Sequence, residues 1–236
     1  MSKFNKKLSI IVPVYNEKNT IKEIIKRIKL VKNIRKQIIL VDDCSTDGTE
    51  VVIRNELLSK VDKVIFHKKN MGKGAAINSA KKFLKGDFVI VQDADLEYDP
   101  EDYYKILKVL EKNKKVVYGS RVLGKERYSV KNFSSKSRVF FNHILTIFTN
   151  ILYNQKLTDA HTCYKAFHTS LFMSISLKEN DFAFCPEVTA KISKHGIKIS
   201  EVPIKYVGRT YSQGKKISIF DGFRAIYVLI KYRFIS

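Results

Sequence analysis

The sequence is poor in cysteine and lacks the common glycine-rich nucleotide motifs. Its three cysteines, Cys44, Cys163 and Cys185, are widely spaced and form no CxxC pair. We therefore expect reduced thiols in a cytosolic protein rather than zinc ligands or disulfides. No GxGxxG motif follows the first apolar stretch, and no complete Walker A sequence occurs. A bound nucleotide must be held by another arrangement.

Long apolar runs are also missing. The most apolar stretch, Arg138–Tyr153, is shorter than the roughly 20 residues that span a bilayer. Leu8–Val14 is too short for the apolar region of a signal peptide and is better interpreted as a strand. The chain reaches Ser236 without a transmembrane segment, so we expect any membrane contact to be peripheral or mediated by a partner.

Acidic residues are few relative to basic ones. Forty-four Lys and Arg oppose 23 Asp and Glu, which leaves a formal charge of +21. Nucleic acid, an anionic membrane and phosphorylated substrates are all compatible with this charge. No RNA- or DNA-binding motif is present, and acidic residues follow several predicted strands, so nucleic acid is not expected as a partner.

The pattern of apolar segments predicts an α/β fold. The length of 236 residues and a hydrophobic content of 44% suit one domain with a full core. Helices are predicted between successive strands, which favours right-handed βαβ units and a mostly parallel sheet. The first-half strands are predicted at Leu8–Val14, Gln37–Val41, Val61–His67, Phe88–Gln92 and Val116–Gly119. In the second half we predict helices at Arg138–Tyr153, Glu187–His195 and Ile217–Phe234, with a strand at Lys198–Val207.

The fourth predicted strand ends in closely spaced acids. Phe88–Gln92 is followed by Asp93, Asp95 and Glu97. Side chains at i and i+2 of an extended segment point the same way, so Asp93 and Asp95 can face one small volume. Their repulsion there calls for a cation, and hard oxygen ligands favour Mg²⁺ or Mn²⁺, which would carry a substrate diphosphate. A solvated turn is the alternative for this motif taken alone.

Three other strand ends carry related chemistry. Tyr15 can stack on a base and Glu17 can accept from a base or ribose, while Asp42 and Asp43 place further acids on the same edge. Lys73 lies between two glycines at the start of a predicted helix, where it can reach a phosphate. Ligands of open α/β sheets bind at the carboxyl ends of the strands. Four such ends together predict a nucleotide-diphosphate site.

These segments resemble a known family. IIVPVYNE, ILVDDCSTDGT, NMGKGAA, VIVQDADLEYDP and YGSR are similar to the motifs of family 2 glycosyltransferases, which have the GT-A fold. TDAHTCYKAF, FCPEVTAKI, EVPIKYVGRTY and GKK more narrowly resemble the dolichol-phosphate mannose synthase-like branch. The resemblance implies a single glycosyltransferase domain over residues 1–236. Residues 1–120 would bind the nucleotide sugar, and residues 121–236 would bind the acceptor and carry amphipathic interfacial helices.

The resemblance also implies roles for single residues at the donor site. Asp95 would hold the metal that bridges the diphosphate, beside Asp93, and Glu97 is a candidate second metal ligand where relatives often have Gln. The residues implied in nucleotide-sugar binding, together with those suggested by the strand ends, are Pro13, Tyr15, Glu17, Asp42, Asp43, Lys73, Asp93, Ala94 and Asp95.

Basic residues of the second half are implied in phosphate and acceptor binding. These are Arg121, Arg138, Arg209 and Lys215, and we expect Arg121 and Arg209 to act with Asp95 in catalysis. His161 departs from the pattern, because relatives often have an acidic residue near this position. Its role is open, with packing as the alternative to a function.

The acceptor is either a lipid phosphate or a sugar hydroxyl. Inverting transfer to a hydroxyl of a surface polysaccharide or glycoprotein needs a general base, for which Asp159, Asp181 and Glu187 are candidates. A phosphate is already ionised and needs cations instead, and the second half is rich in Lys and Arg. We therefore expect an inverting, metal-dependent enzyme that moves a hexose from GDP-mannose or UDP-glucose to a dolichyl or undecaprenyl phosphate.

A lipid acceptor implies a location at the membrane. The apolar segment Arg138–Tyr153 and the basic, amphipathic segment Ile217–Phe234 are suited to the interface of an anionic bilayer. Closure of the domain core is the alternative for both helices. We expect peripheral association with the cytoplasmic face, with a membrane-anchoring partner protein as a further possibility.

Overall fold

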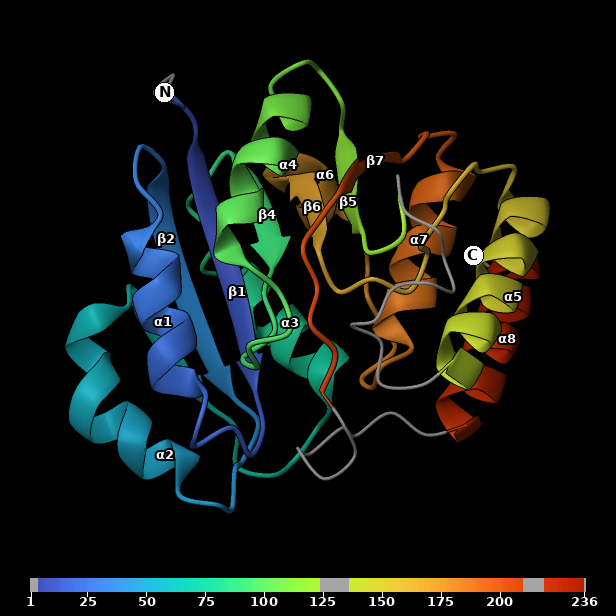
Figure 1. Cartoon of the computed structure of the whole chain (residues 1–236). Coiled ribbons are helices and arrows are strands. Elements are labelled where there is room, and N and C mark those ends of the chain that lie inside the picture. Colours follow the sequence, from blue (N-terminus) through green and yellow to red (C-terminus); the bar gives the residue numbers. More distant parts are fainter. Residues whose placement is uncertain (1–3, 124–135, 210–218, 236) are drawn as a thin grey trace.

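The computed structural model describes residues 4–123, 136–209 and 219–235, and its centre is a seven-stranded sheet (Figure 1). The strand order is β3-β2-β1-β4-β6-β5-β7, and all neighbours are parallel except β6, which is antiparallel to β4 and β5. The strands are β1 Lys7–Val14, β2 Arg35–Asp42, β3 Lys63–Phe66, β4 Phe88–Val91, β5 Val116–Ser120, β6 Lys165–His168 and β7 Ser200–Pro203. The predicted mixed α/β architecture with a mostly parallel sheet is confirmed.

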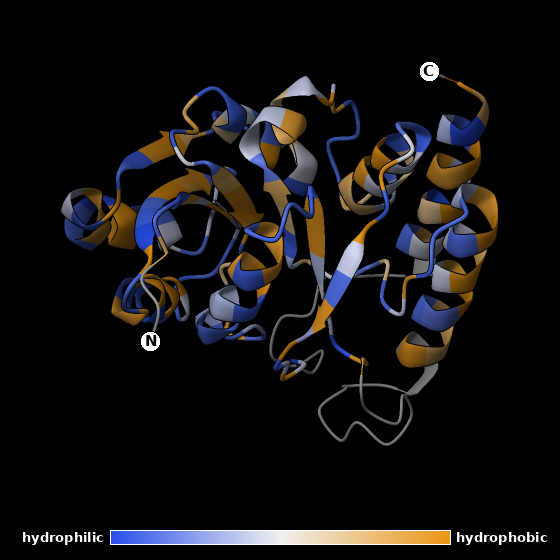
Figure 2. Ribbon diagram, turned by 90° about the horizontal axis from the view of Figure 1, so that it is seen from above, coloured by the Kyte–Doolittle hydropathy of each residue, from blue (hydrophilic) through white to orange (hydrophobic). Residues whose placement is uncertain are grey.

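Helices cover both faces of the sheet because its strands are apolar on both sides. Residues 8–14 of β1 are all buried, and alternate residues enter two separate cores. One core contains α1 (Ile21–Leu30) and α4 (Tyr103–Leu110), and the other contains α3 (Lys73–Lys81), α6 (Thr169–Ser174) and α7 (Phe184–Lys194). The strands are mostly hydrophobic in Figure 2. α2 (Thr49–Val52) continues into a π-helical turn and a 3₁₀ turn that end at Lys60.

The sequence analysis missed β6 and α6 and overestimated β7. β6 has only four residues and mixes Lys165 and His168 with apolar neighbours, so it has neither the length nor the alternation of a recognisable strand. The predicted strand Lys198–Val207 is paired only over Ser200–Pro203, because the chain then leaves β5. Beyond that point Tyr206 pairs with Tyr98, which brings the end of this segment over the acidic turn after β4.

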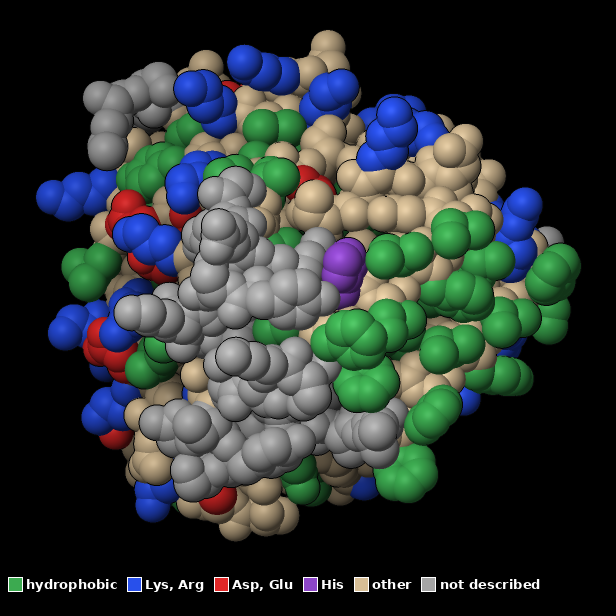
Figure 3. All heavy atoms as spheres, turned by 45° about the vertical axis from the view of Figure 1, so that its right-hand side comes forward, with side chains coloured by type: hydrophobic (Ala, Val, Ile, Leu, Met, Phe, Trp, Pro, Cys, Tyr) green, Lys and Arg blue, Asp and Glu red, His purple; other side chains and the backbone are tan. Residues whose placement is uncertain are grey.

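Two long helices, α5 (Lys136–Tyr153) and α8 (Ile219–Phe234), lie side by side next to α7 (Figure 1). Their inner sides share a small core with α7 that contains Tyr153, Val228 and Leu229. Their outer sides are exposed and apolar, and hydrophobic side chains gather over this part of the surface (Figure 3). In the part of the chain that the structure describes, no helix is long and apolar enough to cross a membrane.

The topology brings the predicted acidic segments to one edge of the sheet. β1 lies between β2 and β4 and is parallel to both, so the carboxyl ends of the three strands meet. Chain order runs outward from β1 to β2 and β3, then returns to β4 on the other side of β1. Such a reversal opens a crevice beyond the strand ends, where ligands of open α/β sheets bind.

Candidate functional site

A pocket of about 410 Å³ lies at this crevice, between the ends of β1 and β4. Tyr98 from the turn after β4 completes it, together with residues from later in the chain: His161, Cys163, Phe182 and Tyr206. Most of the predicted site residues line it: Pro13, Tyr15, Glu17, Asp43, Lys73, Asp93, Ala94, Asp95, Glu97, Arg121 and Arg209.

Among the predicted site residues that the structure describes, Asp42 is the one that does not line the pocket. Asp42 is fully buried, and its carboxylate accepts from the Ser45 hydroxyl at 2.5 Å. Burial raises the pKa of Asp42, although hydrogen bonds from Ser45 oppose the shift. Lys215 and the side chain of Arg138 lie outside the described residues, although the Arg138 backbone belongs to the first turns of α5.

The acids after β4 are engaged by three different groups. Asp93 pairs with the Lys73 ammonium, and Asp95 accepts from Arg209 Nη2 at 3.1 Å. Glu97 accepts from the Tyr206 hydroxyl at 3.0 Å and from the Arg209 amide at 2.6 Å. Within residues 4–123, 136–209 and 219–235, no three Asp, Glu, His or Cys side chains form a metal-binding cluster.

The electrostatics of Asp95 fit a divalent cation. Burial raises the pKa of Asp95 to about 7, and the neighbouring carboxylates of Asp93 and Glu97 add to the shift. Burial acts to raise the pKa of Asp93, but the Lys73 charge, hydrogen bonds from Cys163 and Lys73, and the Arg209 charge together hold it below its usual value. Negative charge thus remains under-compensated at Asp95. Mg²⁺ is commonly held by one or two carboxylates together with substrate phosphates, which matches this donor set.

Arg209 joins the two halves of the pocket. Its guanidinium donates to both oxygens of Glu17, at 3.0 and 2.9 Å, as well as to Asp95. The three side chains come from the segment that follows β7, the turn after β1 and the turn after β4. A guanidinium fork pairs with two oxygens of a carboxylate or a phosphate. Arg209 therefore sits where a diphosphate would compete with carboxylates for its donors.

Asp43 shapes the loop that carries Lys73. Its carboxylate accepts from the amides of Met71 and Gly72, at 2.9 and 2.7 Å, and contacts His67 Nδ1 at 2.6 Å. The backbone of Gly72 has a φ of +96°, a conformation that residues other than glycine rarely adopt. Lys73 then reaches Asp93 and lies 3.1 Å from Cys163 Sγ. The strand exit Asp42-Asp43 thus orients a loop in the pocket wall.

None of the three candidate bases lines the pocket. Asp159 is buried and pairs with Arg121 through two side-chain contacts of 2.7 and 2.8 Å. The Arg121 charge holds the pKa of Asp159 below its usual value in spite of burial. Glu187 is fully buried, where it accepts from the amides of residues 178 and 179. Asp181 is half-exposed and pairs with Arg224 at 3.2 Å.

His161 has a polar atom without a protein partner. It lines the pocket, and its Nε2 is buried with no hydrogen-bond partner among the described residues. Burial lowers the pKa of His161 to about 3, helped by the positive charge of Lys165, so the imidazole is neutral near pH 7. The sequence left this position open, and the structure adds a nitrogen that a ligand can satisfy.

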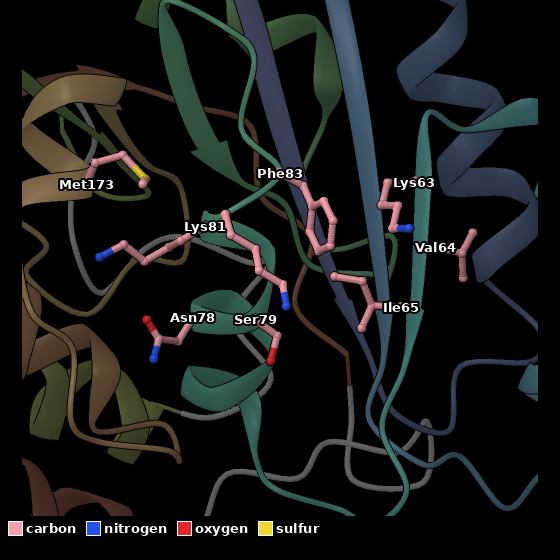
Figure 4. A pocket seen from close by; sticks show the side chains of 9 residues that line it. Lys63, Val64, Ile65, Asn78, Ser79, Lys81, Phe83 and Met173 are labelled. Carbon is pink, nitrogen blue, oxygen red and sulfur yellow. The ribbon is translucent and has the colours of Figure 1, made fainter.

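A larger cavity of about 630 Å³ lies between β3 and α3 (Figure 4). Its wall includes Lys63, Lys81 and Lys82 but no carboxylate. Lys81 is already used, because its ammonium donates to the Ile175 carbonyl at 2.5 Å. The residues for which the sequence predicts metal and diphosphate binding line the smaller pocket at the strand ends instead.

Comparison with known proteins agrees with this geometry. The family model described as glycosyl transferase family 2 matches residues 9–176. The chain belongs to this family. The family 2 enzyme is 29% identical to the UDP-N-acetylglucosamine–dolichyl-phosphate N-acetylglucosaminyltransferase of Methanococcus voltae, over 96% of each chain. It is 28% identical to the dolichol-phosphate mannosyltransferase of Pyrococcus furiosus, over 96% of this chain and 64% of that protein.

Solved structures confirm the GT-A fold of the family 2 enzyme. The glucosyl-3-phosphoglycerate synthase of Mycobacterium tuberculosis, in complex with Mn²⁺, UDP and glucosyl-3-phosphoglycerate, superposes with a TM-score of 0.70. The two proteins are 15% identical over 98% of this chain and 81% of the other. This likeness concerns the fold.

Proposed function

We propose that this glycosyltransferase moves a hexose, with inversion, from a nucleoside-diphosphate sugar to a polyprenyl phosphate. The observation that carries the proposal is the pocket itself, which combines the under-compensated Asp95 with Lys73, Arg121 and Arg209. The donor candidates remain GDP-mannose and UDP-glucose. UDP-N-acetylglucosamine joins them because the Methanococcus voltae relative is named for that donor.

The donor would lie across the ends of β1 and β4. Tyr15 and Glu17 would contact the base and ribose, and Arg209 and Lys73 would bind the diphosphate. Asp95, with the diphosphate, would hold Mg²⁺ or Mn²⁺, which supplies positive charge for the leaving group. The basic side chains of the pocket add to this stabilisation as negative charge develops on the diphosphate.

The acceptor would be an ionised phosphate. Its oxygen attacks the anomeric carbon, the bond from that carbon to the diphosphate breaks, and the diphosphate leaves with the electron pair. No proton needs to be removed, which suits a pocket that none of the candidate bases lines. Asp159 fixes the orientation of Arg121 in the pocket wall, where Arg121 would bind the acceptor phosphate.

Transfer to a sugar hydroxyl is the second candidate. It is favoured by His161, whose unpartnered Nε2 can accept a proton from a hydroxyl held in the pocket. The low pKa of the imidazole makes it a weak base, which counts against this reaction.

A donor and acceptor panel tests the proposal. The protein is incubated with each of the three nucleotide sugars, Mn²⁺ or Mg²⁺, and a short polyprenyl phosphate, and lipid-linked product is measured by mass spectrometry. We expect product from one donor and none when EDTA is added. Transfer to oligosaccharide acceptors with no lipid product in any reaction would instead support the second candidate, and His161→Gln should then abolish turnover.

The outer faces of α5 and α8 would seat the enzyme on an anionic membrane. The exposed side chains along one side of α5 are Phe140, Phe141, Ile144, Ile147 and Ile151, and along one side of α8 they are Phe220, Phe223, Tyr227, Ile230 and Phe234. Aromatic and aliphatic faces of this kind insert into the bilayer interface. The net charge of +21 favours an anionic lipid surface as the binding partner of this face. A second copy of the chain carries the same charge and would be repelled.

Removing two exposed rings should weaken membrane binding. Phe220 and Phe223 are 77% and 66% exposed, so a Phe220→Ser/Phe223→Ser variant should fold normally. We expect its partition onto mixed phosphatidylcholine–phosphatidylglycerol vesicles to fall by at least about tenfold in sedimentation assays. Leu30→Ser/Val51→Ser, at exposed apolar positions on α1 and α2, is the matched control. Equal vesicle binding by the two variants would contradict the assignment of a membrane-binding face. A dimer that only Phe220→Ser/Phe223→Ser abolishes would show that this face binds a second copy of the chain instead.

A further inference from the structure

The segment between α6 and α7 contacts both the proposed membrane-facing helix and the catalytic pocket. We propose that Glu179 is a positioning residue that couples α8 to the loop carrying Lys73, so that seating α8 on a membrane tightens donor binding. This inference rests on the proposed function, because it assigns a regulation to the same donor site. Three successive sets of contacts carry it.

The first set fastens α8 to Glu179. The Glu179 carboxylate accepts from Arg224 Nη2 at 2.6 Å, from Lys231 Nζ at 2.8 Å and from the Tyr232 hydroxyl at 2.9 Å. Its side chain is only 4% exposed, and a buried carboxylate with three donors has a strongly defined position. Arg224 also pairs with Asp181 at 3.2 Å. A displacement of α8 must therefore move Glu179 and Asp181 or break their contacts with the helix.

The second set joins Glu179 to the glycine loop. The carbonyl of Asn180, the next residue, accepts from the Ala75 amide at 3.0 Å. A Cβ atom added to Gly72 would lie 2.4 Å from the Asn180 oxygen, and one added to Gly74 would lie 2.1 Å from the Glu179 oxygen. The backbone of residues 179–180 thus packs against both glycines with no room for a methyl group. Contacts this close transmit a shift instead of absorbing it.

The third set reaches the pocket. Lys73 lies between the two glycines and pairs with Asp93 in the pocket wall. Phe182, three residues after Glu179, lines the same pocket, and its ring centroid is 5.9 Å from Lys73 Nζ. One short segment therefore positions both Lys73 and Phe182. The amide of Glu179 is bonded to Glu187 of α7, whereas the side chains of Glu179 and Asp181 contact α8. Through these side chains the position of α8 bears on the donor-phosphate side of the pocket.

The test is whether membranes change nucleotide affinity, and through which residue. The dissociation constant of UDP or GDP with Mn²⁺ is measured by calorimetry, with and without mixed phosphatidylcholine–phosphatidylglycerol vesicles. For the wild type we expect vesicles to tighten binding by about fivefold or more. Glu179→Gln and Arg224→Gln should lose this effect while still sedimenting with vesicles. A merely structural role of Glu179 would leave the vesicle dependence unchanged.

Arg233→Gln is the matched control. Arg233 is an exposed cation of α8, so its loss changes membrane electrostatics as the loss of Arg224 does, and it should retain the vesicle effect. If Glu179→Gln does not fold, Arg224→Gln carries the test, since it leaves Lys231 and Tyr232 on the carboxylate. Equal vesicle effects in all variants, or none in a wild type that turns over donor, would overturn the coupling alone. A wild type that binds no nucleoside diphosphate would overturn both the coupling and the proposed function.

Discussion

Replacing Asp95 with alanine is expected to abolish sugar transfer, lowering kcat/KM by at least about a thousandfold. The carboxylate is buried, and burial together with Asp93 and Glu97 raises its pKa to about 7. A cation relieves this excess of negative charge, and the alanine variant loses the group that would hold the cation beside the diphosphate. Initial rates and Mn²⁺ titration by calorimetry, in the presence of the nucleoside diphosphate, measure the two effects separately.

Two further variants, Asp95→Asn and Glu101→Gln, test whether the loss of activity in Asp95→Ala is due to the charge at this position. Asparagine keeps the size of the side chain, so a loss equal to that of alanine assigns the effect to charge. Glu101 is an exposed acid six residues further along the chain, and its replacement should leave turnover unchanged. If Asp95→Ala keeps most of the activity and of the Mn²⁺ affinity, the metal and the diphosphate must bind elsewhere in the pocket.

The gathering of the acidic strand ends was predictable because the signal is local. Apolar runs mark β1 and β4, and each ends in polar side chains within a few residues. Parallel strands then bring their carboxyl ends to one edge whatever their exact lengths. Tyr15, Glu17, Asp93 and Asp95 consequently line one pocket, as the sequence suggested. The individual roles assigned to them remain predictions.

Contacts that depend on the third dimension were not predictable. Arg209 and Glu17 are 192 positions apart, and only the path of the chain after β7 places them together. Asp42 and Asp43 are adjacent acids on one strand end and look equivalent in sequence. Because successive side chains of a strand point to opposite sides, Asp42 bonds with Ser45, whereas Asp43 bonds with the glycine loop.

The base candidates show a related limit of sequence reasoning. Asp159 and Glu187 each have the chemistry of a general base, but partners elsewhere in the chain occupy them. Arg121 lies 38 positions from Asp159, and Glu187 accepts backbone amides from the turn before its own helix. The apolar helices were ambiguous for the same reason, since α8 uses Val228 and Leu229 for the core while its opposite side is exposed.

Replacing Arg209 with alanine is expected to lower turnover by about 100- to 1,000-fold, because in the proposed reaction its guanidinium donates to the negative charge that develops on the diphosphate. If the role of Arg209 were purely structural, its replacement would weaken Mn²⁺ binding as well as turnover. We expect the opposite: Arg209 Nη2 lies 3.1 Å from Asp95, so its removal should strengthen Mn²⁺ binding in the absence of nucleotide.

Arg209→Lys should not restore turnover, because an ammonium cannot reproduce the two contacts with Glu17. Lys205→Ala, at an exposed cation four residues earlier, should change neither rate nor metal affinity. Turnover and Mn²⁺ affinity that fall together in Arg209→Ala would show that the pocket collapses without the arginine, which would remove it from the catalytic groups.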